Sequence, residues 1–248
     1  MPTILAIETS SELASCALLQ GERVLYRESS GVRTHSQSIL PMLQALLREA
    51  GLALQDCDAI AYGAGPGSFT GVRTACGIAQ GLAFGAALPV LPVVTLEAMA
   101  LACRQQCGAT DIVTVLDARM GEVYWARYAF ADAGSAAGAS AALASTLVPP
   151  TLSAPAGVGA HGTLVSACGN GLAAYAPAFE ASGFGAGIHP GIMPHAVQIG
   201  QLARIAFAAG AGLPARDAQP LYLRNKIAFT SAERHAMQHA KAQALVAT

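Results

Sequence analysis

Charged and aromatic residues are scarce in this 248-residue sequence. Charged residues make up 12% and aromatic residues 6%, whereas hydrophobic residues reach 53%, so the chain can bury a sizeable core. The basic and acidic residues nearly balance at a net charge of −1, and no cluster of lysine and arginine stands out. Because a protein that grips nucleic acid alone needs a basic surface, we do not expect this chain to hold nucleic acid by itself.

From the sequence we also expect no membrane span, no leader and no paired cysteines. The longest apolar stretch, 77–94, contains Gln80, two prolines and three glycines, which is poor material for a membrane helix. No basic region precedes the apolar run at the N-terminus, and no cleavage signature follows it. The six cysteines stand singly without a CxxC pair, as reduced core residues do. We therefore expect a cytoplasmic protein with no membrane contact.

Glycine is plentiful between Gly63 and Gly85. The first half of this stretch, GAGPGSFTG, is a loop of the kind that cradles a phosphate at a helix N-terminus. It lacks the Lys-Ser/Thr pair of a P-loop, and it misses the dinucleotide fingerprint by one residue. We favour a structural turn, with a phosphate contact as the alternative.

The second half of this stretch has the pattern of a helix with Gly77, Gly81 and Gly85 along one stripe. Each glycine costs about 1 kcal/mol relative to alanine in a helix interior, so we expect another backbone to pack against the stripe. Apolar residues flank it, which indicates burial in the chain's own core or against a partner. We predict a partner interface that also uses the helix at 38–50. Its residues would be Leu43, Leu47, Val72, Ala75, Gly77, Ile78, Gly81, Leu82 and Gly85.

Strand and helix patterns alternate along the chain and then restart. The predicted order is strands at 4–8, 14–19 and 23–27, a helix at 38–50, a strand at 58–62, a helix at 70–85, a strand at 90–94 and a helix at 96–106. The strand at 113–117 can be laid over 4–8, and a turn and a second strand follow each. We predict an α/β protein with lobes at 1–108 and 109–230, each with a mixed sheet, and a tail at 231–248.

Five segments carry a resemblance to a known family. The segments ILAIETS, HSQSILPMLQALL, GAGPGSFTGVRTACGIAQGLAFG, VLDARMGEVYWARY and PLYLRNK look like the bacterial TsaB family, also called YeaZ-like. The resemblance implies a two-lobe actin-like (ASKHA) fold with ribonuclease H-like lobes. It also implies a non-catalytic dimerisation subunit for the formation of threonylcarbamoyladenosine beside the anticodon of tRNAs that read codons starting with A.

The same resemblance implies partners. These are a TsaD-type catalytic subunit and a TsaE-type ATPase, with tRNA bound only through the complex and a homodimer also open. ATP and metal would be used by the complex, and we expect no cofactor on this chain itself. An independent ATP-dependent small-molecule kinase of the same superfamily is the alternative function.

In the resembled superfamily, an acidic residue at the end of the first strand of a lobe holds the hydrated metal of a nucleotide. Glu8 and Asp117 occupy these positions, and Asn170 resembles the adenosine-loop position. Glu8 departs from the aspartate of active relatives, and its extra methylene displaces the carboxylate. The three residues are candidate nucleotide contacts, and polar groups that solvate or cap turns are the alternative interpretation.

The sequence offers no complete catalytic or metal-binding set. His235 and His239 stand four apart, a spacing that could bind zinc on a helix face. No cysteine lies nearby and Glu233 is the only neighbouring carboxylate, so we predict surface histidines and no metal site. The sequence has no GxSxG elbow and no HExxH, which disfavours a peptidase, and we predict no catalytic residue.

Overall fold

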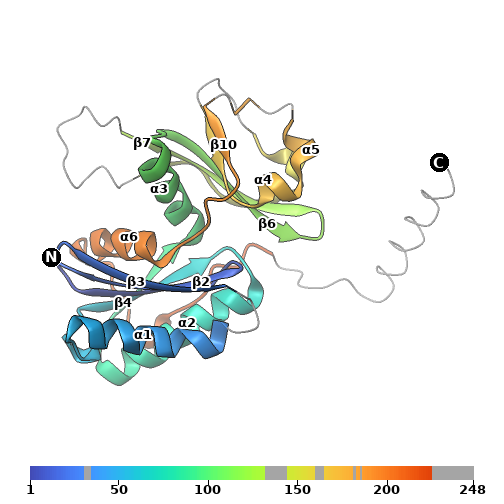
Figure 1. The fold of residues 1–248 in the computed structure, drawn as a ribbon. Helices are drawn as coiled ribbons and strands as arrows, with labels where there is room; N and C mark the ends of the chain where they lie inside the picture. Colours follow the sequence, from blue (N-terminus) through green and yellow to red (C-terminus); the bar gives the residue numbers. More distant parts are fainter. Residues whose placement is uncertain (31–34, 132–143, 160–164, 181–182, 185, 225–248) are drawn as a thin grey trace, which may run out of the picture.

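The chain folds into two α/β lobes, as predicted (Figure 1). The computed structural model describes residues 1–30, 35–131, 144–159, 165–180, 183–184 and 186–224. The pair His235 and His239 lies outside these residues, as does the predicted tail. Among the helices that are described, none is long and apolar enough to cross a membrane.

The first lobe is built on a five-stranded mixed sheet of order β3-β2-β1-β4-β5. Strand β1 pairs antiparallel with β2 and parallel with β4, and β4 pairs parallel with β5. All side chains of β1 and β4 are buried, as expected for central strands covered on both faces. The strands are β1 (Ile4–Glu8), β2 (Leu13–Gln20), β3 (Arg23–Ser30), β4 (Ala59–Gly65) and β5 (Val90–Val94).

The second sheet repeats the topology of the first. Its order is β10-β9-β6-β7-β8, so its first strand again pairs antiparallel with the second and parallel with the next. This repeat confirms the restart that the sequence pattern predicts, although β10 was not predicted. The strands are β6 (Asp111–Arg119), β7 (Glu122–Phe130), β8 (Ala144–Ser153), β9 (Ser166–Cys168) and β10 (Gly187–His189).

Helices form three layers around the two sheets (Figure 1). Helices α1 (His35–Ala50) and α2 (Phe69–Ala86) cover the outer face of the first sheet. Helices α3 (Thr95–Cys107) and α6 (Ala196–Ala208) lie between the sheets in one continuous core. The short helices α4 (Gly171–Ala174) and α5 (Ala176–Phe179) cover the second sheet. Single turns of 3-10 helix lie at Leu54–Asp56, Pro155–Gly157 and Ala215–Asp217.

The chain returns to the first lobe after the second sheet. Helix α6 packs against β1, β2, β4 and β5 of the first sheet. Beyond α6, the backbone of Leu213 exchanges hydrogen bonds of 2.8 and 2.9 Å with Val90, at the end of the first sheet. The side chain of Tyr62 then contacts the backbone of Gln219. The range 109–230, which we predicted as the second lobe, therefore includes a segment that packs on the first.

Helices α1 and α2 turn their continuous apolar faces to the sheet. Leu43 on α1 and Val72 and Ala75 on α2 are each at most 2% exposed. These three residues were predicted to contact a partner, and the structure places them in the interior of the chain instead. The reason is that each helix has one strongly apolar face, and the sheet covers it.

Candidate functional site

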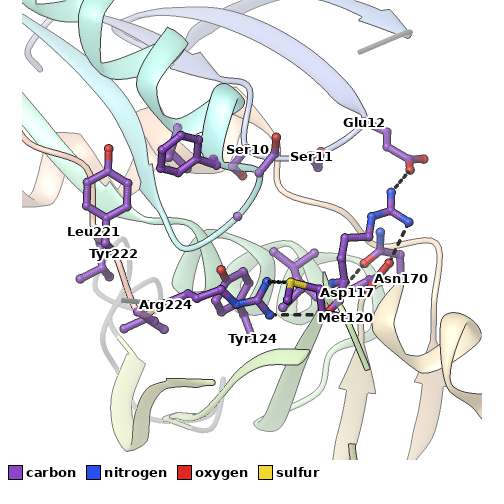
Figure 2. A pocket seen from close by; sticks show the side chains of 18 residues that line it. Ser10, Ser11, Glu12, Asp117, Met120, Tyr124, Asn170, Leu221, Tyr222 and Arg224 are labelled. Carbon is purple, nitrogen blue, oxygen red and sulfur yellow. Dashed lines mark hydrogen bonds and ion pairs between the residues drawn. The ribbon is translucent and has the colours of Figure 1, made fainter. Parts of the chain in front are cut away.

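A cleft of about 350 Å³ opens between the two lobes (Figure 2). Four parts of the chain line it: the β1–β2 turn, the loop at 67–68 with the start of α2, the β6–β7 turn with neighbouring strand residues, and the segment 221–224 that follows α6; Asn170 adds a contact from the turn after β9. Two of the three candidate nucleotide contacts, Asp117 and Asn170, line this cleft, whereas Glu8 does not. Such a volume is within the range of small-molecule pockets.

The β6–β7 turn holds an unusual backbone. Arg119 and Met120 have φ angles of 61° and 60°, a conformation that side chains with a Cβ seldom adopt. The turn presents the guanidinium of Arg119 to two carboxylates, Asp117 at 3.0 Å and Glu12 of the opposite lobe at 3.1 Å. Arg119 thereby bridges the mouth of the cleft.

The carboxylate of Asp117 is fully engaged by this chain's own groups. Its Oδ1 accepts hydrogen bonds from the Arg119 backbone N–H at 2.7 Å and from the Tyr175 hydroxyl at 3.0 Å. Its Oδ2 pairs with the Arg119 guanidinium, and its backbone N–H donates to Asn170 Oδ1 at 3.0 Å. The side chain of Asp117 is only 9% exposed, so few directions remain for a metal ion.

Glu8 lies behind the wall of the cleft and is fully buried. The backbone N–H of Ser10 donates to one of its oxygens, and the Thr95 hydroxyl lies 3.5 Å from the other. Burial raises the pKa of Glu8 above its usual 4.5, although these hydrogen bonds oppose the shift. The carboxylate sits against Gly63, where a Cβ would lie 1.8 Å from its Oε2. The position therefore serves packing and not an open metal site.

The glycine-rich loop is shaped by contact with the β1–β2 turn. A Cβ on Gly67 would fall 2.6 Å from the Cβ of Ser10, and the backbone N–H of Ser68 donates to the Ser10 carbonyl at 2.7 Å. The loop continues into α2, where the Ser68 hydroxyl accepts from the backbone of Gly71. These close approaches explain why glycine is needed in the loop, in agreement with the structural turn that we favoured. The structure leaves the alternative, a phosphate contact, untested.

The segment after α6 ties the two lobes together along the cleft. The backbone N–H of Leu221 donates to the carbonyl of Ala64 in the first lobe at 2.7 Å. Arg224 then reaches the second lobe, where it pairs with Glu122 and donates to the carbonyl of Arg119 at 3.3 Å. No local pattern in the sequence indicates these contacts.

A second candidate site is the outward side of α2. Gly77, Gly81 and Gly85 are exposed, and apart from the adjacent backbone of α2 itself, no atom of the described chain lies within 4 Å of the point where each would carry a Cβ. Their neighbours Ile78 and Leu82, with Leu47 of α1, are partly buried beside the core.

The row of exposed residues on α2 that contains the three glycines extends toward the N-terminus of the helix. Phe69 and Arg73 continue it toward the N-terminus at the same interval of four, and both are exposed. The Arg73 guanidinium stacks 3.4 Å above the Phe69 ring and donates to the hydroxyl of Tyr222 at 2.6 Å. Phe84, which is 81% exposed, lies beside the last glycine. In the sequence, the interval of four residues could have placed Phe69 and Arg73 in line with the glycines. No local pattern indicated that Tyr222 would contact them.

Metal binding finds no support in the described part of the chain. None of its His, Cys, Asp and Glu side chains gather in groups of three or more that could hold a metal ion. The candidates Glu8, Asp117 and Asn170 lie near the ends of three different segments, but they do not converge on one open point, because Glu8 is buried.

Comparison with known proteins gives a consistent family. A family model for TsaD, described as tRNA N6-adenosine threonylcarbamoyltransferase, matches residues 24–185. TsaB of Haemophilus influenzae, described as a tRNA threonylcarbamoyladenosine biosynthesis protein, is 38% identical over 92% of this chain and 95% of its own length. TsaB of Escherichia coli, with the same description, is 39% identical over 91% of this chain and 96% of its own.

A solved structure agrees with these relatives. YeaZ from Pseudomonas aeruginosa superposes with a TM-score of 0.80 at 36% identity, covering 90% of this chain and all of that one. From its sequence, its repeated sheets and these relatives, the chain belongs to the TsaB (YeaZ-like) family.

Proposed function

We propose that this chain is a non-catalytic partner subunit of the complex that forms threonylcarbamoyladenosine beside the anticodon of tRNA. In this role it binds and organises a TsaD-type catalytic subunit, and a TsaE-type ATPase and tRNA join the assembled complex in the cytoplasm. The descriptions of its relatives from Haemophilus influenzae and Escherichia coli name this biosynthesis, which supports the proposal.

The observation that carries the proposal is the open stripe of Gly77, Gly81 and Gly85. Each glycine costs about 1 kcal/mol relative to alanine in a helix, and no neighbour in the described part of the chain accounts for that cost. A second backbone that packs into the bare groove accounts for it. The exposed ring of Phe84 gives such a contact an apolar edge. A TsaD-type subunit is the partner we propose, and a second copy of this chain is the competing occupant.

The state of the two acidic positions supports a non-catalytic role. Glu8 is buried behind the cleft, and both oxygens of Asp117 are engaged by Arg119 and Tyr175. A kinase needs carboxylates that are free to hold hydrated metal beside a phosphate. The geometry therefore favours the partner subunit over the alternative of an independent small-molecule kinase.

The substitution Gly81→Leu tests the proposal, because its side chain enters open space in the isolated chain. We expect the melting temperature to stay or rise, since leucine has the higher helix propensity. Association with the TsaD-type subunit should weaken by about 1 to 3 kcal/mol, the usual cost of overpacking. Melting curves and size-exclusion chromatography of the mixture measure the two effects. Gly191→Leu is the matched control, because Gly191 is also exposed with open space at its Cβ but lies in the other lobe.

Two results would contradict this function. The first is a Gly81→Leu chain that melts much earlier and yet binds its partner unchanged, which would place the stripe in the core. The second is multiple-turnover ATP hydrolysis by the chain alone that Glu8→Ala and Asp117→Ala abolish, which would favour the kinase. Chromatography of the unmixed chain over a range of concentrations reports whether a homodimer competes for the stripe.

A further inference from the structure

The exposed surface at the N-terminal end of α2 continues onto a residue from the segment 221–224. The Tyr222 hydroxyl accepts a hydrogen bond from Arg73 Nε at 2.6 Å, and the centroids of the Tyr222 and Phe69 rings are 6.0 Å apart. The Arg73 guanidinium lies 3.4 Å from the centroid of one ring and 5.3 Å from that of the other. Phe69 and Tyr222 are 36% and 44% exposed, so Tyr222 belongs to the same surface as the start of α2.

The guanidinium of Arg73 keeps donors available for a partner. Its Nε is bound to Tyr222, whereas its two Nη atoms make no hydrogen bond within the described part of the chain. Stacking on Phe69 fixes the orientation of the guanidinium plane, which suits the planar carboxylate of an acidic side chain. A partner with such a side chain at this end of α2 would pair with Arg73 while the bond to Tyr222 persists.

The other end of the same segment holds the β6–β7 turn (Figure 2). Arg224, whose side chain is 14% exposed, pairs with Glu122 and donates to the Arg119 carbonyl at 3.3 Å. Its Nη1 also lies 3.3 Å from the sulfur of Met120. One side chain from the segment 221–224 thus contacts three residues of the turn.

The β6–β7 turn depends on contacts of this kind. The left-handed φ angles of Arg119 and Met120 are strained for residues with a Cβ, and such strain persists only where the surrounding structure holds it. Through the Arg119 guanidinium, the turn also reaches Glu12 of the first lobe. Loss of the Arg224 contacts should therefore loosen both the turn and the contact between the lobes at the mouth of the cleft.

The segment 221–224 joins α2 to the turn over a short distance. Tyr222 and Arg224 are two residues apart, which an extended chain spans in at most about 7 Å. The hydrogen bond of Leu221 to the first sheet, at 2.7 Å, anchors the segment just before Tyr222. Leu223 packs against the core between the two sheets. A constraint on Tyr222 is therefore passed on to Arg224 and is not lost in a long loop.

We propose that the segment 221–224 couples a partner docked at the N-terminal end of α2 to the β6–β7 turn at the cleft. For the identity of that partner, a TsaD-type subunit, the inference rests on the function proposed above. An acidic side chain of the partner that pairs with Arg73 fixes Tyr222, and the segment then holds Arg224 on the turn. Such coupling is reciprocal, so a chain in which Arg224 no longer holds the turn should bind the partner more weakly.

The first experiment needs no partner. Hydrogen exchange of the full-length chain is followed by mass spectrometry in the parent and in Tyr222→Phe, which keeps the ring and removes only the hydroxyl. We expect the amides of 118–123 to exchange at least about threefold faster in the variant, because the turn opens more often. Thr74→Ala is the matched control, since it also removes one side-chain hydrogen bond from α2, the bond to the Thr70 carbonyl. This control should leave exchange at 118–123 unchanged.

The second experiment measures docking by calorimetric titration of the TsaD-type subunit. Arg224→Met lies away from α2, yet its affinity should be at least about fivefold lower than that of the parent chain, as is usual for coupled sites. Arg127→Met is the matched control, because the Arg127 side chain is 15% exposed and pairs with Asp111 at the start of β6, opposite the end that leads into the turn. The affinity of Arg127→Met should stay within about twofold of the parent. Melting curves show that each variant is folded at the assay temperature.

Two results would overturn the coupling. One is exchange at 118–123 in Tyr222→Phe that is as slow as in the parent chain. The other is a parent chain that binds the TsaD-type subunit while Arg224→Met binds as tightly as Arg127→Met. If the parent chain does not bind the subunit at all, the proposed function fails instead, and the exchange experiment alone decides the coupling.

Discussion

The carbonyl oxygen of Thr9 lies 1.9 Å from the point where Gly71 would carry a Cβ. The Thr9 hydroxyl also donates to the Gly71 carbonyl at 2.7 Å, so the β1–β2 turn is fixed on the first turn of α2. Only glycine allows this approach of two backbones. The glycines of α2 are therefore present for different reasons. Gly71 is needed for a close backbone contact within the chain, whereas Gly77 makes no such contact in the described part of the chain.

Gly71→Ala and Gly77→Ala should therefore change stability in opposite directions. The first forces a methyl group into the Thr9 backbone and should lower the free energy of unfolding by about 1 to 3 kcal/mol or more. The second removes the helix penalty of glycine and should raise the free energy of unfolding by up to about 1 kcal/mol. Urea denaturation of the isolated chain measures both. Equal losses in the two variants would show that the outward side of α2 is also packed within the chain.

The buried carboxyl of Glu8 predicts a pH dependence of stability. Its folded pKa lies above 4.5, so the folded state holds the proton more tightly than the unfolded state. The stability that Glu8 contributes is complete below pH 4.5 and is lost as the pH rises through the folded pKa. Glu8→Gln removes this titration while keeping an oxygen that can accept from the Ser10 backbone.

Relative to Glu8→Gln, the parent chain should lose about 1.4 kcal/mol of stability for each pH unit between the unfolded and folded pKa values. Above the folded pKa the difference should stay constant. Denaturation of both proteins at a series of pH values gives the curve. A difference that does not change with pH, or that grows in the parent's favour toward neutral pH, would contradict burial as the dominant cause.

Local patterns were sufficient to predict much of this fold. Signals within a few residues of each other mark the glycine-rich loop followed by α2, the three strands at the start, and the repeat of the strand pattern after Asp111. Because the same strand pattern occurs twice along the chain, the second sheet is expected to have the topology of the first. The return of α6 to the first lobe carried no such signal. Its contact with β1 joins residues about 190 positions apart.

The candidate sites show the same limit: local patterns in the sequence could be interpreted, but contacts between distant segments could not be predicted. Periodicity grouped Leu43 with Leu47 on one side of α1, but it could not say that the sheet would bury Leu43. The same limit applies to Glu8, whose burial depends on Gly63 and Thr95 from other segments. The contact of Arg119 with Glu12 depends on a positive φ in a turn without glycine at that position, which sequence patterns do not predict.

Two of the ion pairs at the cleft, Arg119–Glu12 and Arg224–Glu122, should differ in their contributions to stability. Arg119 and Glu12 are 72% and 67% exposed, so Glu12→Gln should change the free energy of unfolding by less than about 1 kcal/mol. The Arg224 side chain is only 14% exposed and also donates to the Arg119 carbonyl. Arg224→Met leaves that carbonyl and Glu122 without their partner and should cost about 1 to 3 kcal/mol. Thermal melts of the two variants at low and high salt measure these losses. A larger loss in Glu12→Gln than in Arg224→Met would contradict the contacts described here.

His195 begins helix α6 and joins it to the edge of the first sheet. Its Nδ1 accepts a hydrogen bond from the backbone N–H of Val197 at 3.2 Å, and its Nε2 lies 3.4 Å from Glu28. The Tyr26 ring and the imidazole pack in a T-shaped arrangement, with their centroids 5.3 Å apart. Burial lowers the pKa of His195 below 6.5, although the adjacent Glu28 carboxylate opposes the shift. Protonation of Nδ1 would also end its role as acceptor at the helix N-terminus.

His195→Asn should therefore remove an acid-sensitive part of the stability while keeping the helix cap. In the parent chain, the unfolded state binds the proton more tightly, so stability falls as the pH drops below 6.5 toward the folded pKa. The asparagine oxygen accepts from the same backbone N–H without titrating. We expect similar stabilities near pH 8 and a relative loss in the parent below 6.5, up to about 1.4 kcal/mol for each pH unit between the two pKa values. Denaturation across this range measures the difference, with His195→Ala as a control that lacks the cap at every pH. If the parent chain instead gained stability over His195→Asn on acidification, the Glu28 carboxylate and not burial would dominate at this position.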